Sequence, residues 1–156
     1  MPAFLNPKAR DVWSTARVKV WEGSVVLATF PRFAGDRVAA FAGRVSLREP
    51  AAFVAFVTEG EDCSLTTSEA AFEAWRLKGR ATGVVTGLRA ITIDAAMPVD
   101  LVGFLAPLAD RLALAKIPII PQCGFHTDHV LVPEARLDDA LVVINQLIAD
   151  ADKEGH

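Results

Sequence analysis

A short polar stretch holds the residues of this chain that are best suited to chemistry. Residues 125–129, with the sequence FHTDH, lie between the apolar residues 119–120 and 130–132. Their imidazole, hydroxyl and carboxylate groups could hydrogen-bond a small ligand. The apolar runs predict two strands joined by a turn, with a helical pattern on either side. This order indicates a binding module rather than an enzyme.

A metal site is an alternative use of the same region. Cys123, His126 and His129 recur at intervals of three, and thiolate and imidazole are common metal ligands. Residues three apart on a strand point to opposite faces, although a turn over 124–128 could bring two of them together. A small metal-binding protein or enzyme using these three residues therefore stays open as an alternative.

Catalytic motifs find little support elsewhere. No serine or cysteine nucleophile has a recognisable base and orienting group. Gly79, Gly83 and Gly87 lack the strand–turn–helix setting of a phosphate-binding loop. We therefore expect a protein that is not an enzyme and needs no cofactor.

The hydrophobic patterns predict the same order of elements in both halves of the chain. In the first half we expect strands at 18–21 and 24–30 around a turn at 22–23, a helix over 36–43 capped by Asp36, strands at 52–58 and 63–67, and a helix capped by Ser68. In the second half we expect a strand at 84–93, a helix beginning at Met97-Pro98 that must accommodate Pro107, a strand pair flanking 125–129, and a final helix from Leu137.

The repeated order suggests two units. Strand, helix, strand, turn, strand, helix occurs over 24–78 and again over 88–149. We place an N-terminal unit at 16–83, a C-terminal unit at 84–150 and an extended arm at 1–15, with a loose tail after 150. Helices would cover one face of an antiparallel sheet.

The bulk composition fits a compact protein that binds neither nucleic acid nor membrane. Of the 156 residues, 52% are hydrophobic and 22% charged, enough for a core. The net charge of −3, without a basic cluster, argues against nucleic acid. No apolar run approaches the roughly 20 residues of a transmembrane helix, and no secretory signal pattern opens the chain. We expect a cytoplasmic protein in which Cys63 and Cys123 are buried or half-buried thiols.

Three segments of the second half resemble the ACT domain family. They are 102–106 (VGFLA), 112–119 (LALAKIPI) and 125–132 (FHTDHVLV), and the resemblance covers about 88–148. The branch it points to contains the regulatory domains of aspartate kinases and cellular arginine sensors. Residues 56–66 (FVTEGEDCSLT) look like a turn of the same family's N-terminal unit. The chain departs from the family pattern at His126 and His129, which bears on the identity of the ligand.

The resemblance implies an α+β fold of two ferredoxin-like βαββα units with an amino acid or similar effector bound between them. Asp128 would pair with a ligand ammonium and Thr127 would donate a hydroxyl. Gly103 would let a ligand carboxylate approach backbone N–H groups near a helix start. Completing the implied contacts are the backbone and apolar wall of Phe104 and Leu105, and, from the first unit, Asp62, Ser64 and Leu65.

Several of these residues could instead have a purely structural role. Asp128 could simply form a turn by bonding its own backbone, Gly103 could serve close packing, and Ser64 could be an ordinary strand residue. We nevertheless predict a regulatory protein that binds a small molecule, with an amino acid as the expected ligand and a homodimer or a regulatory protein as partner. A ligand-free assembly module is a further alternative.

Overall fold

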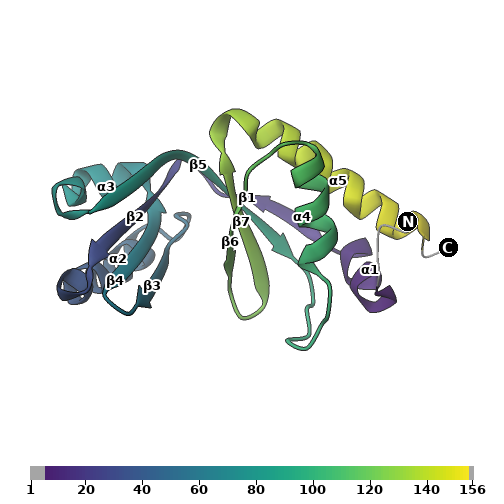
Figure 1. The fold of residues 1–156 in the computed structure, drawn as a ribbon, viewed down its shortest axis with the longest axis horizontal. Coiled ribbons are helices and arrows are strands. Elements are labelled where there is room, and N and C mark those ends of the chain that lie inside the picture. The colour runs from purple at the N-terminus through teal and green to yellow at the C-terminus, as the bar shows by residue number, and fades with distance from the viewer. Residues whose placement is uncertain (1–5, 155–156) are drawn as a thin grey trace. The chain divides into compact units, whose positions relative to one another are not determined.

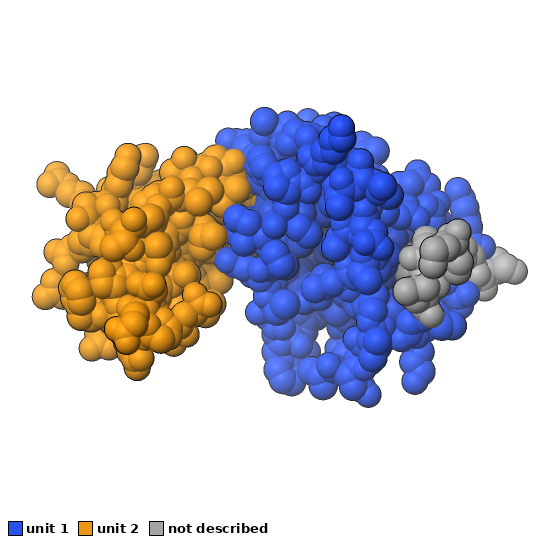
Figure 2. Space-filling view, in the orientation of Figure 1, with its two compact units in different colours: residues 1–20, 91–156 blue, residues 21–90 orange. Residues whose placement is uncertain are grey.

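The computed structural model describes residues 6–154 and divides into two compact units. Unit 2 comprises residues 21–90, and unit 1 comprises residues 1–20 together with 91–156 (Figure 2). Unit 2 is thus inserted in the sequence of unit 1. The expected units at 16–83 and 84–150 are consecutive in sequence. In the structure, by contrast, unit 1 combines two segments that lie on either side of unit 2 in the sequence.

Unit 2 is an antiparallel sheet with helices on one face (Figure 1). In chain order its elements are β2 (Val25–Pro31), η1 (Arg32–Ala34), α2 (Gly35–Arg48), β3 (Ala55–Glu59), β4 (Asp62–Ser68), α3 (Glu69–Ala74), η2 (Leu77–Arg80) and the first part of β5 (Gly83–Asp94). The strands follow the order β3-β4-β2-β5. Its core joins the inward face of β2 and β4 to the apolar side of α2 and α3, with Phe30, Phe41 and Leu65 among the buried residues.

Unit 1 repeats this architecture with an extra helix (Figure 1). Its elements are α1 (Pro7–Ser14), β1 (Arg17–Val20), the second part of β5, α4 (Leu105–Leu114), β6 (Ile120–Cys123), β7 (Thr127–Pro133), η3 (Glu134–Arg136) and α5 (Leu137–Glu154). β7 lies between β5 and β6, and β1 pairs with residues 91–94 of β5. The core includes Ile91, Leu108, Val130 and Ile144, all fully buried. The predicted α+β class with two ferredoxin-like units is confirmed.

The expected arm at 1–15 is wrong for residues 7–14, which form α1. Asn6 caps this helix, since its side-chain oxygen accepts a hydrogen bond from the Lys8 N–H at 2.9 Å. Pro7 stands at the first helical position, where its missing N–H costs nothing. Burial of Ala9 and Trp13 supplies the packing that so short a helix needs. The first five residues of the expected arm lie outside the described residues.

Strands lie close to the expected positions 18–21 and 24–30, but they do not pair with each other. β1 pairs with β5, whereas β2 pairs with β4 and with the first part of β5. The segment between them, in which Gly23 has φ +70°, connects β1 of unit 1 to β2 of unit 2. A turn signal between two apolar runs does not by itself say whether those runs pair.

Two helix starts also differ from expectation. α2 begins at Gly35 without a side-chain cap, so that Asp36 lies in the first turn, and the helix continues to Arg48. α4 begins at Leu105 rather than at Met97-Pro98. Pro107 is then the third helical residue, where an N–H has no intrahelical partner, so proline fits without a kink. By contrast, Ser68 caps α3 as predicted, accepting from the Ala71 N–H at 3.2 Å.

The C-terminal helix is confirmed and is longer than expected. α5 continues through Glu154, so the first residues of the expected loose tail are helical. The remainder of that tail, 155–156, lies outside the described residues. Arg111 of α4 and Asp150 of α5 join the two helices through an N–O distance of 2.6 Å.

Candidate ligand-binding site

A pocket of about 440 Å³ opens in unit 1 between the loop that leads into α4 and the turn that joins β6 to β7. Its volume falls in the range of about 300–1,000 Å³ that is usual for small-molecule sites. One wall comes from residues 97–106 and the other from residues 123–128. The pocket therefore contains most of the polar stretch singled out from sequence, together with a helix start.

The start of α4 forms one wall of the pocket and has no side-chain cap. Phe104 occupies the cap position and provides no side-chain hydrogen bond. The first N–H groups of a helix have no intrahelical partner, and the helix dipole makes this end attractive to anions. Gly103 precedes them with φ +83°, a left-handed conformation that favours glycine. A carboxylate of a ligand could therefore meet backbone N–H groups of residues 104–106.

The N-terminal helix holds this wall in place. The indole Nε1–H of Trp13 donates to the Phe104 carbonyl at 2.8 Å, and the two rings stack with centroids 4.6 Å apart. The side-chain amide of Asn6 donates to the Val102 carbonyl at 2.8 Å. Both contacts join residues more than 90 positions apart in sequence. The loop into α4 is thus positioned by a segment that contributes no group of its own to the pocket lining.

The opposite wall is a tight hairpin turn. The Gly124 N–H donates to the Thr127 carbonyl at 2.8 Å, and Cys123 stands opposite Asp128 in the β6–β7 register. A Cβ atom at Gly124 would lie 3.3 Å from three atoms, the Nε2 of His129 and the Oγ1 and carbonyl oxygen of Thr127. Gly124 therefore allows the turn to close against these side chains. Phe125 at its tip is largely exposed and meets the His126 ring edge-on.

Asp128 supplies the negative charge of the pocket. Desolvation by the surrounding protein, then a hydrogen bond with Asp128 and the charge of that carboxylate, raises the pKa of the Cys123 thiol. Cys123 is therefore a neutral thiol at pH 7, and it stands beside a carboxylate that is half-buried. This carboxylate faces the pocket that contains the helix start. The site thus combines an anionic side chain with a set of backbone donors.

His129 lies behind the turn and braces it. Its Nδ1 is 2.7 Å from the Thr92 hydroxyl and its Nε2 is 3.3 Å from the Thr127 hydroxyl. Burial lowers the pKa of His129, the nearby Asp128 opposes this shift, and Lys19 adds to it. A neutral imidazole, which can donate through one nitrogen and accept through the other, suits contacts with two hydroxyls. His129 therefore fixes Thr127 and links the turn to β5.

Five of the eight predicted ligand residues line this pocket: Gly103, Phe104, Leu105, Thr127 and Asp128. The other three belong to β4 of unit 2. There, Asp62 is exposed, Ser64 is half-buried and Leu65 is fully buried in the core. A role for Asp62, Ser64 and Leu65 in ligand binding stays a prediction, as does the binding role of the five that share the pocket.

The metal alternative has no cluster to support it among residues 6–154. No group of three histidine, cysteine, aspartate or glutamate residues in that range could hold a metal ion. Cys123 and His126 line the pocket, whereas His129 is engaged with threonine hydroxyls. The expectation of two buried or half-buried thiols holds only for Cys63, because Cys123 is exposed at the end of an edge strand; both are free thiols.

Sequence reasoning missed the residues that support the pocket. The sequence places Asn6 and Trp13 in the expected arm and Thr92 near the end of the expected strand at 84–93. Asn6 followed by Pro7 is a recognisable helix start, so α1 carried a local signal. The contacts of Trp13 with Phe104 and of Thr92 with His129 carried none, since they depend on the tertiary fold.

The chain is an α+β protein, and its pocket in unit 1 has a size usual for small-molecule sites. Residues 83–146 match the model of the ACT domain family. These residues therefore form an ACT domain, and the resemblance inferred from sequence is confirmed. None of the curated proteins matches the chain significantly.

Solved structures extend the similarity over most of the chain. A protein of unknown function from Vibrio cholerae is 18% identical, with a TM-score of 0.63 over 89% of this chain and 94% of its own. The regulatory subunit of aspartate kinase from Thermus thermophilus, in its ligand-free form, is 15% identical, with a TM-score of 0.56 over 85% and 95%. Aspartokinase III from Escherichia coli, solved with aspartate and ADP, is 13% identical, with a TM-score of 0.60 over 85% of this chain and 33% of that one.

At these identities the structural matches establish the fold that the chain shares with these proteins. The ACT domain at residues 83–146 supports a regulatory, ligand-binding role for the chain. Within residues 6–154, none of the helices is both long and apolar enough to cross a membrane.

Proposed function

We propose that this protein is a non-enzymatic regulator that binds a free amino acid in the pocket of unit 1. The observation that carries the proposal is the pairing, across one pocket, of the Asp128 carboxylate with the uncapped start of α4. An α-amino acid presents an ammonium and a carboxylate on the same carbon. The two walls offer one complementary group to each of these charges.

The ligand's side chain would extend toward the apolar part of the pocket. Met97, Pro98 and Leu101 line that part, and Phe104 closes it with a buried ring. Thr127 would add a hydroxyl whose position is fixed by His129. An uncharged side chain fits this lining best, because Asp128 is the one carboxylate among the lining residues and is taken by the ammonium.

Binding would act by changing populations of conformations. A ligand that joins the turn at 123–128 to the start of α4 favours the arrangement in which both walls are in place, by as much as its affinity for that arrangement exceeds its affinity for others. A partner protein or a second copy of the chain could respond to that difference. We include in the proposal a cytoplasmic location, a homodimer and a contribution of Asp62, Ser64 and Leu65 to ligand binding.

The test is a thermal-shift and calorimetry screen of the full chain against the twenty amino acids. A ligand at 100 times its dissociation constant should stabilise the protein by about 2.7 kcal/mol. Asp128→Asn should abolish most of this stabilisation, because the amide keeps the shape and loses the charge. Asp110→Asn is the matched control, since Asp110 is an exposed acid on α4 outside the pocket.

Ligand analogues separate the two walls. An N-acetylated form of the active amino acid should bind weakly to the wild type and should be indifferent to Asp128→Asn. The corresponding amine without the carboxylate should also bind weakly, but should remain sensitive to Asp128→Asn. If no amino acid stabilises the protein, or if Asp110→Asn and Asp128→Asn weaken binding equally, the proposal is wrong and an assembly role becomes the better reading of the ACT fold.

A further inference from the structure

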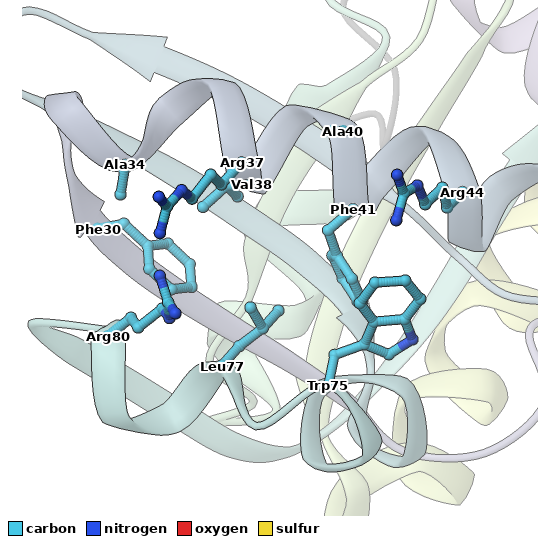
Figure 3. Close-up of a pocket in the computed structure, with 10 residues that line it drawn as sticks. All are labelled: Phe30, Ala34, Arg37, Val38, Ala40, Phe41, Arg44, Trp75, Leu77 and Arg80. Atoms are coloured by element: carbon cyan, nitrogen blue, oxygen red, sulfur yellow. The ribbon is translucent and has the colours of Figure 1, made fainter.

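A second pocket lies entirely within unit 2, on the helical side of its sheet (Figure 3). It has a volume of about 320 Å³ and is bounded by α2, by the segment from the end of α3 through η2, and by Phe30 of β2. This pocket shares no residue with the pocket of unit 1. Its chemistry is also different, because its charged lining residues are all arginines.

The floor of this pocket is apolar and aromatic. Phe30, Phe41 and Leu77 are buried beneath it. The rings of Phe41 and Trp75 form a T-shaped contact with centroids 5.2 Å apart, and Trp75 remains 41% exposed. An indole this exposed offers a planar face on which a ring could stack. The floor is thus suited to a flat ligand rather than to a fully hydrated ion.

Two arginines converge above that floor. Figure 3 shows Arg37 reaching from α2 and Arg80 reaching from η2, both toward Phe30. The side chain of neither arginine makes an ion pair or hydrogen bond with the rest of residues 6–154. A third, Arg44, lies over the Trp75 ring, with its Cζ 5.8 Å from the centroid. No carboxylate is among the lining residues, so nothing in the pocket balances these charges.

This arrangement requires an explanation because the chain as a whole carries a net charge of −3. Cations that face one another over an apolar floor repel, and a bound oxyanion would relieve that repulsion. Guanidinium groups bind phosphate and carboxylate through paired N–H donors, and they also stack on flat rings. Apolar pockets with a few convergent polar groups are where small ligands usually bind.

We propose that the pocket formed by Arg37, Arg80 and the aromatic floor is a second binding site, for a small planar organic anion in which an aromatic or heteroaromatic ring carries a phosphate or a carboxylate. Arg37 and Arg80 would hold the oxyanion from two sides. The ring would lie toward Trp75, flanked by Arg44. This site is separate from the proposed amino-acid pocket and does not depend on it.

The experiment is isothermal titration of the full chain with four probes. AMP carries a ring and a phosphate, indole-3-acetate a ring and a carboxylate, adenosine a ring alone, and inorganic phosphate the charge alone. We expect at least one of the first two to bind, with adenosine and inorganic phosphate each weaker by about tenfold or more. Comparing AMP with indole-3-acetate tells which oxyanion the site prefers. Binding of adenosine or inorganic phosphate as tight as that of the planar anions would overturn the proposal.

Variants then locate the binding. Arg37→Gln and Arg80→Gln should each weaken the planar anion about tenfold or more, because each removes a charge-assisted pair of donors. Arg48→Gln, at an exposed arginine of α2 outside the pocket, is the matched control and should leave affinity unchanged. Because Arg37 and Arg80 are exposed and make no contacts that support the fold, unfolding temperatures of the variants should match the wild type.

Tryptophan fluorescence gives an independent readout. A stacked ring should change the emission of Trp75, and Trp75→Phe should remove this change. Asp128→Asn should leave it intact, since Asp128 belongs to the other unit. Absence of binding by both planar anions, or binding that Arg37→Gln, Arg80→Gln and Arg48→Gln affect equally, would overturn the proposal.

Discussion

Replacing Trp13 tests whether α1 supports the ligand pocket or merely covers the end of the chain. Trp13 is fully buried, its ring stacks on Phe104 at 4.6 Å, and its indole N–H donates to the Phe104 carbonyl at 2.8 Å. Truncating a buried aromatic residue to alanine costs about 3–5 kcal/mol, so Trp13→Ala should destabilise unit 1 by that amount. Trp13→Phe keeps a ring for stacking but loses the hydrogen bond, which is worth about 1 kcal/mol, and part of the buried area, for a total of about 2 kcal/mol.

Hydrogen exchange measured by mass spectrometry is the suitable assay, because it reports each unit separately. Trp13→Ala should lower protection in α4, α5 and β1 and leave α2 and β3 unchanged. Trp75→Ala is the control in the other unit and should show the opposite pattern. If Trp13→Ala left the protection of α4 and α5 at the wild-type level, α1 would not be part of the cooperative core, and the inference that it positions the pocket wall would fail.

Three further predictions concern unit 1. Gly103→Ala should cost about 1–2 kcal/mol in urea unfolding, because φ +83° strains any side chain even though the nearest atom leaves room for a Cβ. Because burial lowers the pKa of His129 below its ordinary 6.5, stability should be full above pH 6.5 and fall as the pH drops through the folded-state pKa; His129→Gln should lack this part of the pH profile. Hydrogen bonds from Arg111 and Gln146 lower the pKa of Asp150 below 3.8, so its contribution should be complete above pH 3.8 and disappear as the pH falls through the lower folded value. In urea unfolding, Arg111→Ala should lower the free energy of unfolding by about 0.5–1 kcal/mol at pH 7. At pH 2 the same substitution should have only the small effect of an ordinary surface change.

The sequence was most informative where structure depends on local chemistry. The cap at Ser68 has an acceptor side chain directly before a helical pattern, and the structure uses it in that way. The break between the expected strands at 52–58 and 63–67 also depends on local residues, because Gly60 there has a positive φ. The polar stretch 125–129 stood out because its neighbours on both sides are apolar, and it forms one wall of the pocket.

The errors arise where distant parts of the chain decide the outcome. Leu101 lies at helical spacing from Leu105, which suggests a helix from residue 97, yet the left-handed Gly103 ends the loop just before α4 begins. Alternating apolar residues at 18–21 predict a strand correctly, but no local feature says that its partner is residues 91–94. The family resemblance placed Gly103 near the helix start that forms one wall of the pocket. It did not indicate that Trp13 holds this wall in place.

The twelve-residue strand β5 gives unit 1 a long-range strand pairing that a folded unit 2 would make easier to form. Its second half completes unit 1 by pairing Val20 with Ile91 and Arg17 with Asp94, so β1 has no partner in the sheet until the chain beyond residue 90 is available. If residues 21–90 were an unstructured loop, closing it would cost about 4 kcal/mol in entropy beyond a constant term. A folded unit 2 removes most of this cost, because the Trp21 N–H then donates to the Ala90 carbonyl at 3.0 Å and holds the two ends together. Folding of the inserted unit 2 would thus lower the entropy cost of bringing the two sequence segments of unit 1 together.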